Sequence, residues 1–250
     1  QPLPSYADQP YPIQIPFEKA IHLKKLSFRY AKEEPWVLKN IDLKLTKGSR
    51  IGFMGLTGSG KSTLFDIIMG LLSPTDGEFT IDDKPINAEN RRSWQAHIAH
   101  VPQNIYLTDS TIEENIAFGI PREQINQQQV KNAAKQAQIA EQIEEWSDGY
   151  QTHVGEKGIR LSAGQCQRIG IARALYKKVN VLIFDEATSA LDDKTEQAVM
   201  EAIEGLGREL TILIIAHRLT TLKGCDQVIE LSNNGVLQFG SFQDVVIKKS

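Results

Sequence analysis

The chain has 250 residues and a mass of 27.9 kDa, which is enough for one large domain or two small ones. Hydrophobic residues make up 41% and charged residues 24% of the sequence, a balance that excludes a disordered or fibrous chain. The net charge of −3 means that the surface is not generally basic, so we expect no nucleic-acid partner. Two cysteines are too few for a disulfide framework, and no apolar run reaches the ~18 residues of a membrane span.

The chain begins at Gln1 rather than Met, and five of its ten prolines fall within the first 16 residues. Proline lacks a backbone donor and favours extended chain, so residues 1–17 are expected to form a linker or a tail. We therefore expect the chain to be a fragment or a processed product. A tether to an upstream domain and a terminus with no role both fit this composition.

The first strands are of two kinds. Residues 21–28 and 41–45 alternate apolar and polar side chains, which predicts half-buried, antiparallel strands. Residues 50–54 are short and nearly continuous in apolar character, which is typical of a strand buried on both faces in a parallel sheet. This change from alternating to continuous apolar residues indicates that an antiparallel region precedes the parallel core of an α/β domain.

A phosphate loop follows this buried strand directly. Gly55-Leu-Thr-Gly-Ser-Gly-Lys61-Ser62 fits the pattern GxxxxGK[ST], and residues 63–69 continue as a helix. Glycines let the backbone wrap a polyphosphate with its N–H groups turned inward, and the helix N-terminus adds partial positive charge. Lys61 is expected to reach the β- and γ-phosphates, and the hydroxyl of Ser62 to ligate Mg²⁺. The sequence predicts a nucleoside triphosphate site rather than a plain strand-to-helix turn.

The middle of the chain changes character twice. Residues 77–82 resemble the first strands in pattern and predict another half-buried strand. Residues 110–147 are polar and rich in Gln and Ala, without strand signals, which predicts a helical insertion. Leu161-Ser-Ala-Gly-Gln165 then opens a helix that Ser162 is expected to cap. The apolar face of that helix is formed by Ile169, Ala172 and Tyr176. A capped helix start can bind an anion, as the phosphate loop can, so the chain carries two half-sites for a phosphate.

Two buried strands later in the chain end in side chains that suit phosphate chemistry. Residues 181–184 lead into Asp185 and Glu186, and residues 211–216 lead into His217. Ligands of α/β proteins bind at the carboxyl ends of parallel strands. Asp185 is therefore expected to hold Mg²⁺, and Glu186 to orient or deprotonate an attacking water.

Asn233-Asn-Gly235 separates two apolar runs, residues 228–231 and 236–239, and predicts a hairpin because Asn and Gly accept positive φ. Together the elements predict an α/β fold with a parallel core sheet, an antiparallel β subdomain and an inserted α-helical subdomain at about residues 105–165.

These motifs, in this order, resemble the nucleotide-binding domain of ATP-binding cassette (ABC) transporters, whose signature motif is LSGGQ. The resemblance covers residues 18–250 and implies the P-loop NTPase fold of ABC ATPases. It extends to an aromatic A-loop residue, a Q-loop glutamine, a D-loop and a switch histidine, which are Tyr30, Gln103, Ser189-Ala-Leu-Asp192 and His217. The whole set is far more specific than a lone phosphate loop.

The resemblance implies a role for each motif. Tyr30 would stack on adenine, Gln103 would contact Mg²⁺ and the attacking water, and His217 would contact the γ-phosphate. Contacts to ATP are then expected from Tyr30, Gly55, Thr57, Gly58, Ser59, Gly60, Lys61, Ser62, Thr63, Ser162, Ala163, Gly164, Gln165 and Asp192. Contacts to Mg²⁺ are expected from Ser62, Gln103 and Asp185, and the catalytic groups are Glu186, His217 and Gln103.

The family also implies a partner. Two such domains, identical or different, pair head to tail, and Ser162 and Gly164 of one cap the γ-phosphate held at Lys61 of the other. Hydrolysis removes this link, so the pair can open. The third signature position here is Ala163, where the family usually has Gly. Its methyl is tolerated if φ is negative there, so we expect a competent site with modestly altered affinity.

Several segments resemble exporters rather than importers: residues 108–119 after the Q-loop, residues 154–158 as an X-loop and residues 216–220 as an H-loop. Within the first of these, Thr111 is expected to cap a helix that continues through Glu113 and Glu114. We therefore expect an ATPase at the cytoplasmic face of a membrane that powers export, with transmembrane domains on the same polypeptide.

Two other assignments stay open at this point. One is a separate ATPase subunit of an importer, for which a C-terminal regulatory domain after the cassette would be the sign. The other is an ABC ATPase of DNA repair or translation, for which coiled-coil insertions or a second cassette would be the sign. A protein that binds ATP without hydrolysing it would be expected to lack Glu186 or His217, and both are present.

Overall fold

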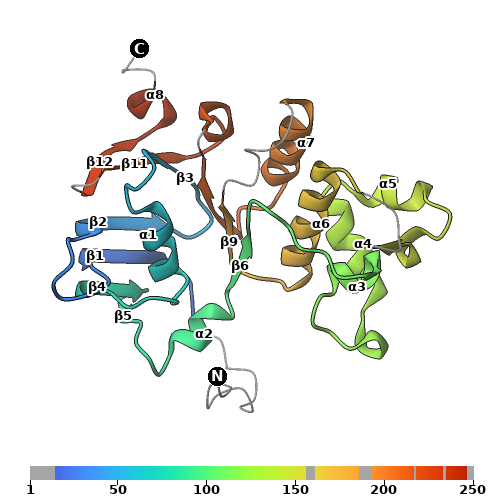
Figure 1. Ribbon diagram of the computed structural model, residues 1–250, viewed down its shortest axis with the longest axis horizontal. Coiled ribbons are helices and arrows are strands. Elements are labelled where there is room, and N and C mark those ends of the chain that lie inside the picture. Colours follow the sequence, from blue (N-terminus) through green and yellow to red (C-terminus); the bar gives the residue numbers. More distant parts are fainter. Residues whose placement is uncertain (1–14, 156–160, 186–192, 217, 233–234, 247–250) are drawn as a thin grey trace.

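A computed structural model of the chain describes residues 15–155, 161–185, 193–216, 218–232 and 235–246 (Figure 1). An antiparallel sheet lies at the left of Figure 1, a mostly parallel sheet occupies the middle, and a group of helices lies at the right. The phosphate loop and α1 (Lys61–Ile68) lie where the two sheets meet.

The antiparallel sheet contains the half-buried strands. In the described residues its order is β2-β1-β4-β5, formed by Leu38–Thr46, Ala20–Phe28, Asp76–Ile81 and Lys84–Pro85. In β1, Leu23 lies opposite Leu43 of β2 and Phe79 of β4, and all three side chains are buried. The three alternating strands expected from the sequence are therefore confirmed, each within a few residues of its predicted ends.

The larger sheet has the order β12-β11-β3-β10-β9-β6 within the described part of the chain. Its strands are Gly235–Gly240, Gln227–Ser232, Arg50–Gly55, Thr211–Ile215, Val181–Asp185 and Ile98–Val101. All neighbours are parallel except β11 and β12, which form the antiparallel pair expected for a hairpin. The predicted buried strands are confirmed, whereas β6 was not predicted because His100 interrupts its short apolar run.

The central strands are apolar throughout because both of their faces are covered. In β9, Val181 and Ile183 face the core shared with α1 and the antiparallel sheet, while Leu182 and Phe184 face the helices on the other side. All four side chains are at most 1% exposed. Since successive side chains of a strand point to opposite faces, a strand covered on both faces needs apolar residues at every position.

The region between β6 and β9 is mainly helical, as expected. Its helices are α3 (Ile112–Ile116), η1 (Arg122–Gln124), α4 (Gln127–Gln136), α5 (Ala140–Glu145), η2 (Gly149–Gln151) and α6 (Ala163–Tyr176). The expected absence of strands there was wrong in one detail, because β7 (Ser110–Thr111) pairs with β8 (His153–Val154). Two residues are too few to show alternation in a sequence. The remaining helices are α2 (Arg91–Gln95), α7 (Asp193–Glu204), η3 (Leu219–Leu222) and α8 (Phe242–Val245).

The segment before β1 is bound to the larger sheet. The ring of Phe17 packs edge-on against Trp94, with the ring centres 5.5 Å apart. The buried His97 lies 2.6 Å from Ile15 O through its Nε2 and 2.6 Å from Asn180 Oδ1 through its Nδ1. Because a carbonyl only accepts, Nε2 is the donor to Ile15. In the described residues, no helix has the length and apolar character needed to cross a membrane.

Candidate functional site: a phosphate loop with its neighbouring strand ends

The phosphate loop needs glycine at defined points. Gly55, Gly58 and Gly60 have φ values of +147°, +84° and +87°, in the region that L side chains rarely adopt. A Cβ on Gly55 would lie 2.3 Å from Leu231 O, and one on Gly60 would lie 2.7 Å from Leu38 Cδ2. Apart from its chain neighbours, a Cβ on Gly58 would meet no atom of the described residues within 4 Å, so there only the backbone angle favours glycine. The loop is therefore bent by its backbone and pressed against β11 and β2.

The start of α1 is open to an anion. Its N-cap is Gly60, no side chain caps the first turn, and no acidic residue lies in that turn. In the described part of the chain, the buried Oγ of Ser59 has no hydrogen-bond partner. Uncapped N–H groups, a partial positive charge and an unused hydroxyl at one helix end are the features of an anion site.

Lys61 lies over the loop. Its side chain is 7% exposed, and Nζ donates to the carbonyl oxygens of Gly55 at 2.7 Å and Leu56 at 3.0 Å. Ser62, the next residue, is exposed, and Thr57 is exposed on the loop. These two bonds hold the Lys61 ammonium group over the loop, where a phosphate oxygen is a stronger acceptor than a neutral carbonyl because it is charged.

Tyr30 stands beside the same helix end. Its hydroxyl oxygen lies 3.1 Å from Oγ1 of Thr63, and its ring packs edge-on against Phe28 with centres 5.0 Å apart. The ring nevertheless remains 60% exposed. The antiparallel sheet therefore brings an exposed aromatic side chain to the phosphate loop.

The carboxyl end of β9 supplies a carboxylate near this loop. Asp185 pairs in register with Ile215 of β10, which in turn pairs with Phe53 of β3, so the three strands end side by side. His100 Nε2 lies 3.9 Å from Asp185 Oδ2, a neighbour that the sequence did not reveal. Burial lowers the pKa of His100, and the charges of Asp185 and Asp66 offset that only in part. Burial also raises the pKa of Asp66 on α1.

Gln103 follows β6 and is exposed. Its carbonyl oxygen accepts a hydrogen bond of 2.6 Å from Nε2 of Gln167, a buried side chain on α6. Gln167 was not predicted, because a lone glutamine in an amphipathic helix gives no signal of a long-range contact. The bond fixes the backbone of the expected Q-loop to the helix that begins at the signature motif.

The signature motif forms a reciprocal cap. Ser162 Oγ accepts from the Gln165 N–H at 3.2 Å, and Gln165 Oε1 accepts from the Ser162 N–H at 2.8 Å. The predicted N-cap is confirmed, and the Ser-x-x-Gln spacing is the signal for its second half. Ala163 is the first residue of α6, so its methyl sits on ordinary helical backbone. Ser162 and Ala163 are exposed, whereas Gly164 is buried.

The segment that resembles exporters is held in place by α6. Thr111 caps α3 as predicted, with Glu114 completing the reciprocal pair at 3.1 and 3.2 Å. From α6, Arg173 donates through Nε to Asn115 O at 2.8 Å and through Nη1 to Tyr106 O at 3.0 Å. The helical region therefore presents this segment on a fixed support.

Three of the expected site residues, Glu186, Asp192 and His217, lie outside the described residues, as do the X-loop residues 156–158. The structure brings Tyr30 to the phosphate loop and places Asp185 on a strand that ends beside β10 and β3. The signature residues lie instead at the start of α6, which packs on the other side of the larger sheet (Figure 1).

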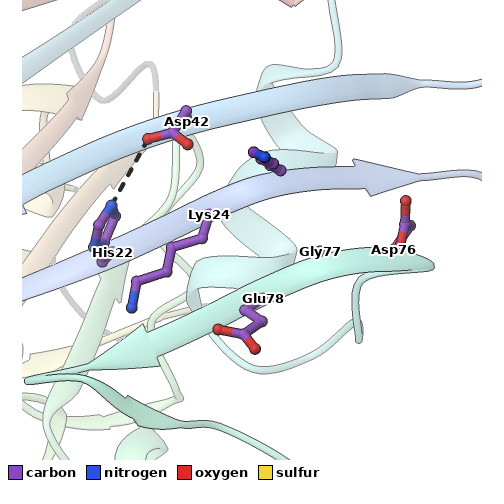
Figure 2. A pocket seen from close by; sticks show the side chains of 7 residues that line it. His22, Lys24, Asp42, Asp76, Gly77 and Glu78 are labelled. Carbon is purple, nitrogen blue, oxygen red and sulfur yellow. Dashed lines mark ion pairs between the residues drawn. The ribbon is translucent and has the colours of Figure 1, made fainter.

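A separate groove lies on the antiparallel sheet and is lined by none of the phosphate-loop residues (Figure 2). It has a volume of about 520 Å³ and is lined by His22, Lys24, Lys25, Asp42, Asp76, Gly77 and Glu78. His22 Nε2 lies 3.7 Å from Asp42 Oδ1 in this groove. Lys24 pairs with Asp83 at 3.3 Å. Because its lining charges are mixed and solvated, it shows no preference for one ligand charge.

The sequence profile of the ABC transporter family matches residues 38–189, which is more than half of the chain. The chain belongs to the ABC transporter family. It therefore has the ABC ATPase fold, which is a nucleotide-binding domain.

Named relatives add detail. The chain is 40% identical over 229 residues to an ATP-dependent lipid A-core flippase of Francisella tularensis subsp. tularensis, a match covering 90% of this chain and 37% of the flippase. It is 39% identical over 229 residues to ABC transporter B family member 14 of Arabidopsis thaliana, covering 91% of this chain and 18% of that protein. A solved bacterial Atm1-family ABC exporter with ATP bound is 33% identical with a TM-score of 0.83, covering 98% of this chain and 42% of that one. The chain thus spans about two-fifths of the length of the flippase and of the Atm1-family exporter, and less than a fifth of the Arabidopsis protein.

Proposed function

We propose that residues 18–250 are the ATP-hydrolysing nucleotide-binding domain of a membrane exporter and that residues 1–17 are the linker from a transmembrane domain on the same polypeptide. The observation that carries the proposal is the phosphate loop, with Lys61 lying over it, Tyr30 exposed beside it and a carboxylate on a parallel strand nearby. The names of the flippase and of the Atm1-family exporter support export as the task.

In this proposal each half of the nucleotide has its own contacts. The exposed ring of Tyr30 stacks on adenine. The backbone of the loop and the first turn of α1 surround the phosphates, and Lys61 exchanges its carbonyl partners for phosphate oxygens. The exchange is favourable because a charged acceptor replaces two neutral ones. The loop contacts come from Gly55, Thr57, Gly58, Ser59, Gly60, Ser62 and Thr63.

The residues present suit a magnesium ion. In the described residues no group of three or more His, Cys, Asp and Glu side chains could hold a metal alone, so the ion would need phosphate oxygens from the nucleotide. That is the usual way in which Mg²⁺ is bound, together with a hydroxyl and one or two carboxylates. Ser62, Gln103 and Asp185 are the proposed ligands, and the bound ion would neutralise charge on the β- and γ-phosphates.

Three further groups act on the attacking water and the γ-phosphate. Glu186, directly after Asp185 in the chain, accepts the proton of the water, and Gln103 helps to orient that water. His217 contacts the γ-phosphate and keeps it in line with the water. β9 and β10 are parallel, with Ile215 in register with Asp185, so both strands end at the same edge of the sheet.

The second half-site requires a second domain. Ser162, Ala163, Gly164 and Gln165 at the capped start of α6 would meet the γ-phosphate bound to a partner domain, with Asp192 at the interface. The two domains then pair head to tail in the presence of ATP and separate after hydrolysis, at the cytoplasmic face of the membrane. We propose no nucleic-acid partner.

The hydrolysis proposal is tested by phosphate release from the wild-type protein and from Glu186→Gln, with Glu201→Gln as a control in an exposed position of α7. A missing general base should lower turnover by about 10²–10⁴-fold while ATP still binds and stabilises a dimer. Glu201→Gln should match the wild type. Turnover of Glu186→Gln at the wild-type rate would refute the assignment of the base.

The exporter architecture is tested in fractionated source cells with an antibody against this chain. A membrane-bound polypeptide far above 27.9 kDa is expected from a fused transmembrane domain. A species near 27.9 kDa that an alkaline wash releases would mean a separate ATPase subunit instead.

A further inference from the structure

One buried carboxylate outside the nucleotide site joins two segments that are far apart in the chain. Glu196 lies in the first turns of α7, and its side chain is 8% exposed. Its Oε2 accepts from Arg218 Nη1 at 2.6 Å. Its Oε1 accepts from the hydroxyls of Thr221 at 2.7 Å and Thr220 at 3.3 Å. Both oxygens of one side chain are therefore bonded to the segment that follows β10.

The hydrogen bonds keep this carboxylate charged. Burial by itself would raise the pKa of Glu196, but the hydroxyl of Thr221 and the guanidinium of Arg218 outweigh it, so the pKa is lowered. A buried, ionised carboxylate loses much when one donor moves away, because the charge is then left without a partner. The donors on the two oxygens thus hold α7 and residues 218–221 in one relative position.

In the chain, each joined segment lies next to residues that the proposed function uses. Arg218 follows His217 in the chain, three residues after the end of β10. The first residue of α7, Asp193, follows Asp192 in the chain. The strands that precede these loops are neighbours, with Ile215 in register with Asp185. Glu196 therefore links residues 218–221, which follow His217 in the chain, to α7, which follows Asp192 in the chain.

We propose that Glu196 is a positioning residue that ties residues 218–221, after β10, to α7, so that a displacement of either segment is passed to the other. Its effect on hydrolysis rests on the proposed function, whereas the link itself belongs to the nucleotide-free protein. Arg218 is its charged partner, and Thr221 fixes the second oxygen.

The first test measures backbone amide hydrogen exchange without nucleotide, in the full protein. Glu196→Gln keeps the size of the side chain but replaces one of the two acceptor oxygens by an NH₂ group, which cannot accept a hydrogen bond, and removes the charge that pairs with Arg218. We expect exchange in residues 219–222 to become about tenfold faster. Arg218→Met should likewise speed exchange in residues 196–200.

The matched control for this test is Glu201→Gln, an exposed glutamate of the same helix whose described bond is to Gln197 Nε2 at 2.9 Å. It should change neither segment. Faster exchange only in the segment that carries each substitution would overturn the proposed link.

The second test separates positioning from stability. Turnover per folded molecule should fall about tenfold in Glu196→Gln and in Arg218→Met, while the dissociation constant for ATP stays within about twofold. The double variant should be no slower than the slower single variant, because the two act as one unit. Lower thermal stability with unchanged turnover would overturn the proposal. If the wild type itself does not hydrolyse ATP, the proposed function fails, and the exchange experiment alone decides whether the link exists.

Discussion

The role of Tyr30 can be tested by separating its ring from its hydroxyl. Tyr30 is 60% exposed and its ring stands nearly perpendicular to that of Phe28, so much of the side chain remains accessible to a base. Stacking of a base on an aromatic side chain contributes about 1–3 kcal/mol, so Tyr30→Ala should weaken ATP binding by about 5- to 150-fold. Tyr30→Phe keeps the ring and loses only the contact of the hydroxyl with Thr63. That loss is about 0.5–1 kcal/mol, or no more than about fivefold.

The assay is isothermal titration calorimetry of the wild type and both variants, with ATP and with inorganic tripolyphosphate. Tripolyphosphate has the phosphates but no base, so its affinity should be the same for the wild type and Tyr30→Ala. If Tyr30→Ala weakens both ligands equally, the tyrosine supports the loop rather than the base. If neither ligand is affected, Tyr30 does not belong to the site.

Three further predictions concern single residues outside that test. Gly58→Ala should lower the free energy of unfolding by about 1–2 kcal/mol, because alanine rarely adopts the left-handed backbone of this position. Gly60→Ala should lower it further, because its Cβ would also lie 2.7 Å from a side chain of β2. Urea unfolding measures both variants, and equal losses would contradict the close approach at Gly60. Burial raises the pKa of Cys225 to about 12, so at pH 8 only about one thiol in 10⁴ is ionised, and iodoacetamide should label it far more slowly in the native than in the unfolded protein. A native rate equal to the unfolded rate would be incompatible with this burial. Although burial opposes it, Asp82 has a lowered pKa because its carboxylate accepts from the N–H groups of residues 18–20. Its stabilisation is therefore present above its unfolded pKa and lost as the pH falls through the lower folded value, below about pH 4. Asp82→Asn should be less stable at pH 7 and lose less on acidification, and an unchanged acid profile would be evidence against this.

Features that depend on a few consecutive residues could be predicted from the sequence. The glycines of the phosphate loop, the caps at Thr111 and Ser162 and the apolar strands β9 and β10 follow from local rules on φ, hydrogen bonding and burial. Each of these features can be recognised from about eight consecutive residues of the sequence. The structure agrees with the predictions at these places.

Contacts between distant segments could not be predicted in the same way. His100 beside Asp185 depends on β6 being the neighbour of β9, and β6 is too short and too polar to be recognised. The bonds from Gln167 to Gln103 and from Arg218 to Glu196 join residues 64 and 22 positions apart. Their side chains are ordinary for a helix or a loop, so the pairing is a property of the sheet order rather than of any local pattern.

The anchoring of Ile15 through His97 has a mechanical consequence. His97 bonds Ile15 on one side and Asn180, which precedes β9, on the other, and Phe17 is packed on Trp94. A force applied to the chain before residue 15 would therefore act on the edge of the larger sheet, through His97, before it acted on β1. Strain applied there would be carried first toward the strand that ends in Asp185. In a single-molecule pulling experiment, His97→Ala should shift the first rupture to lower force.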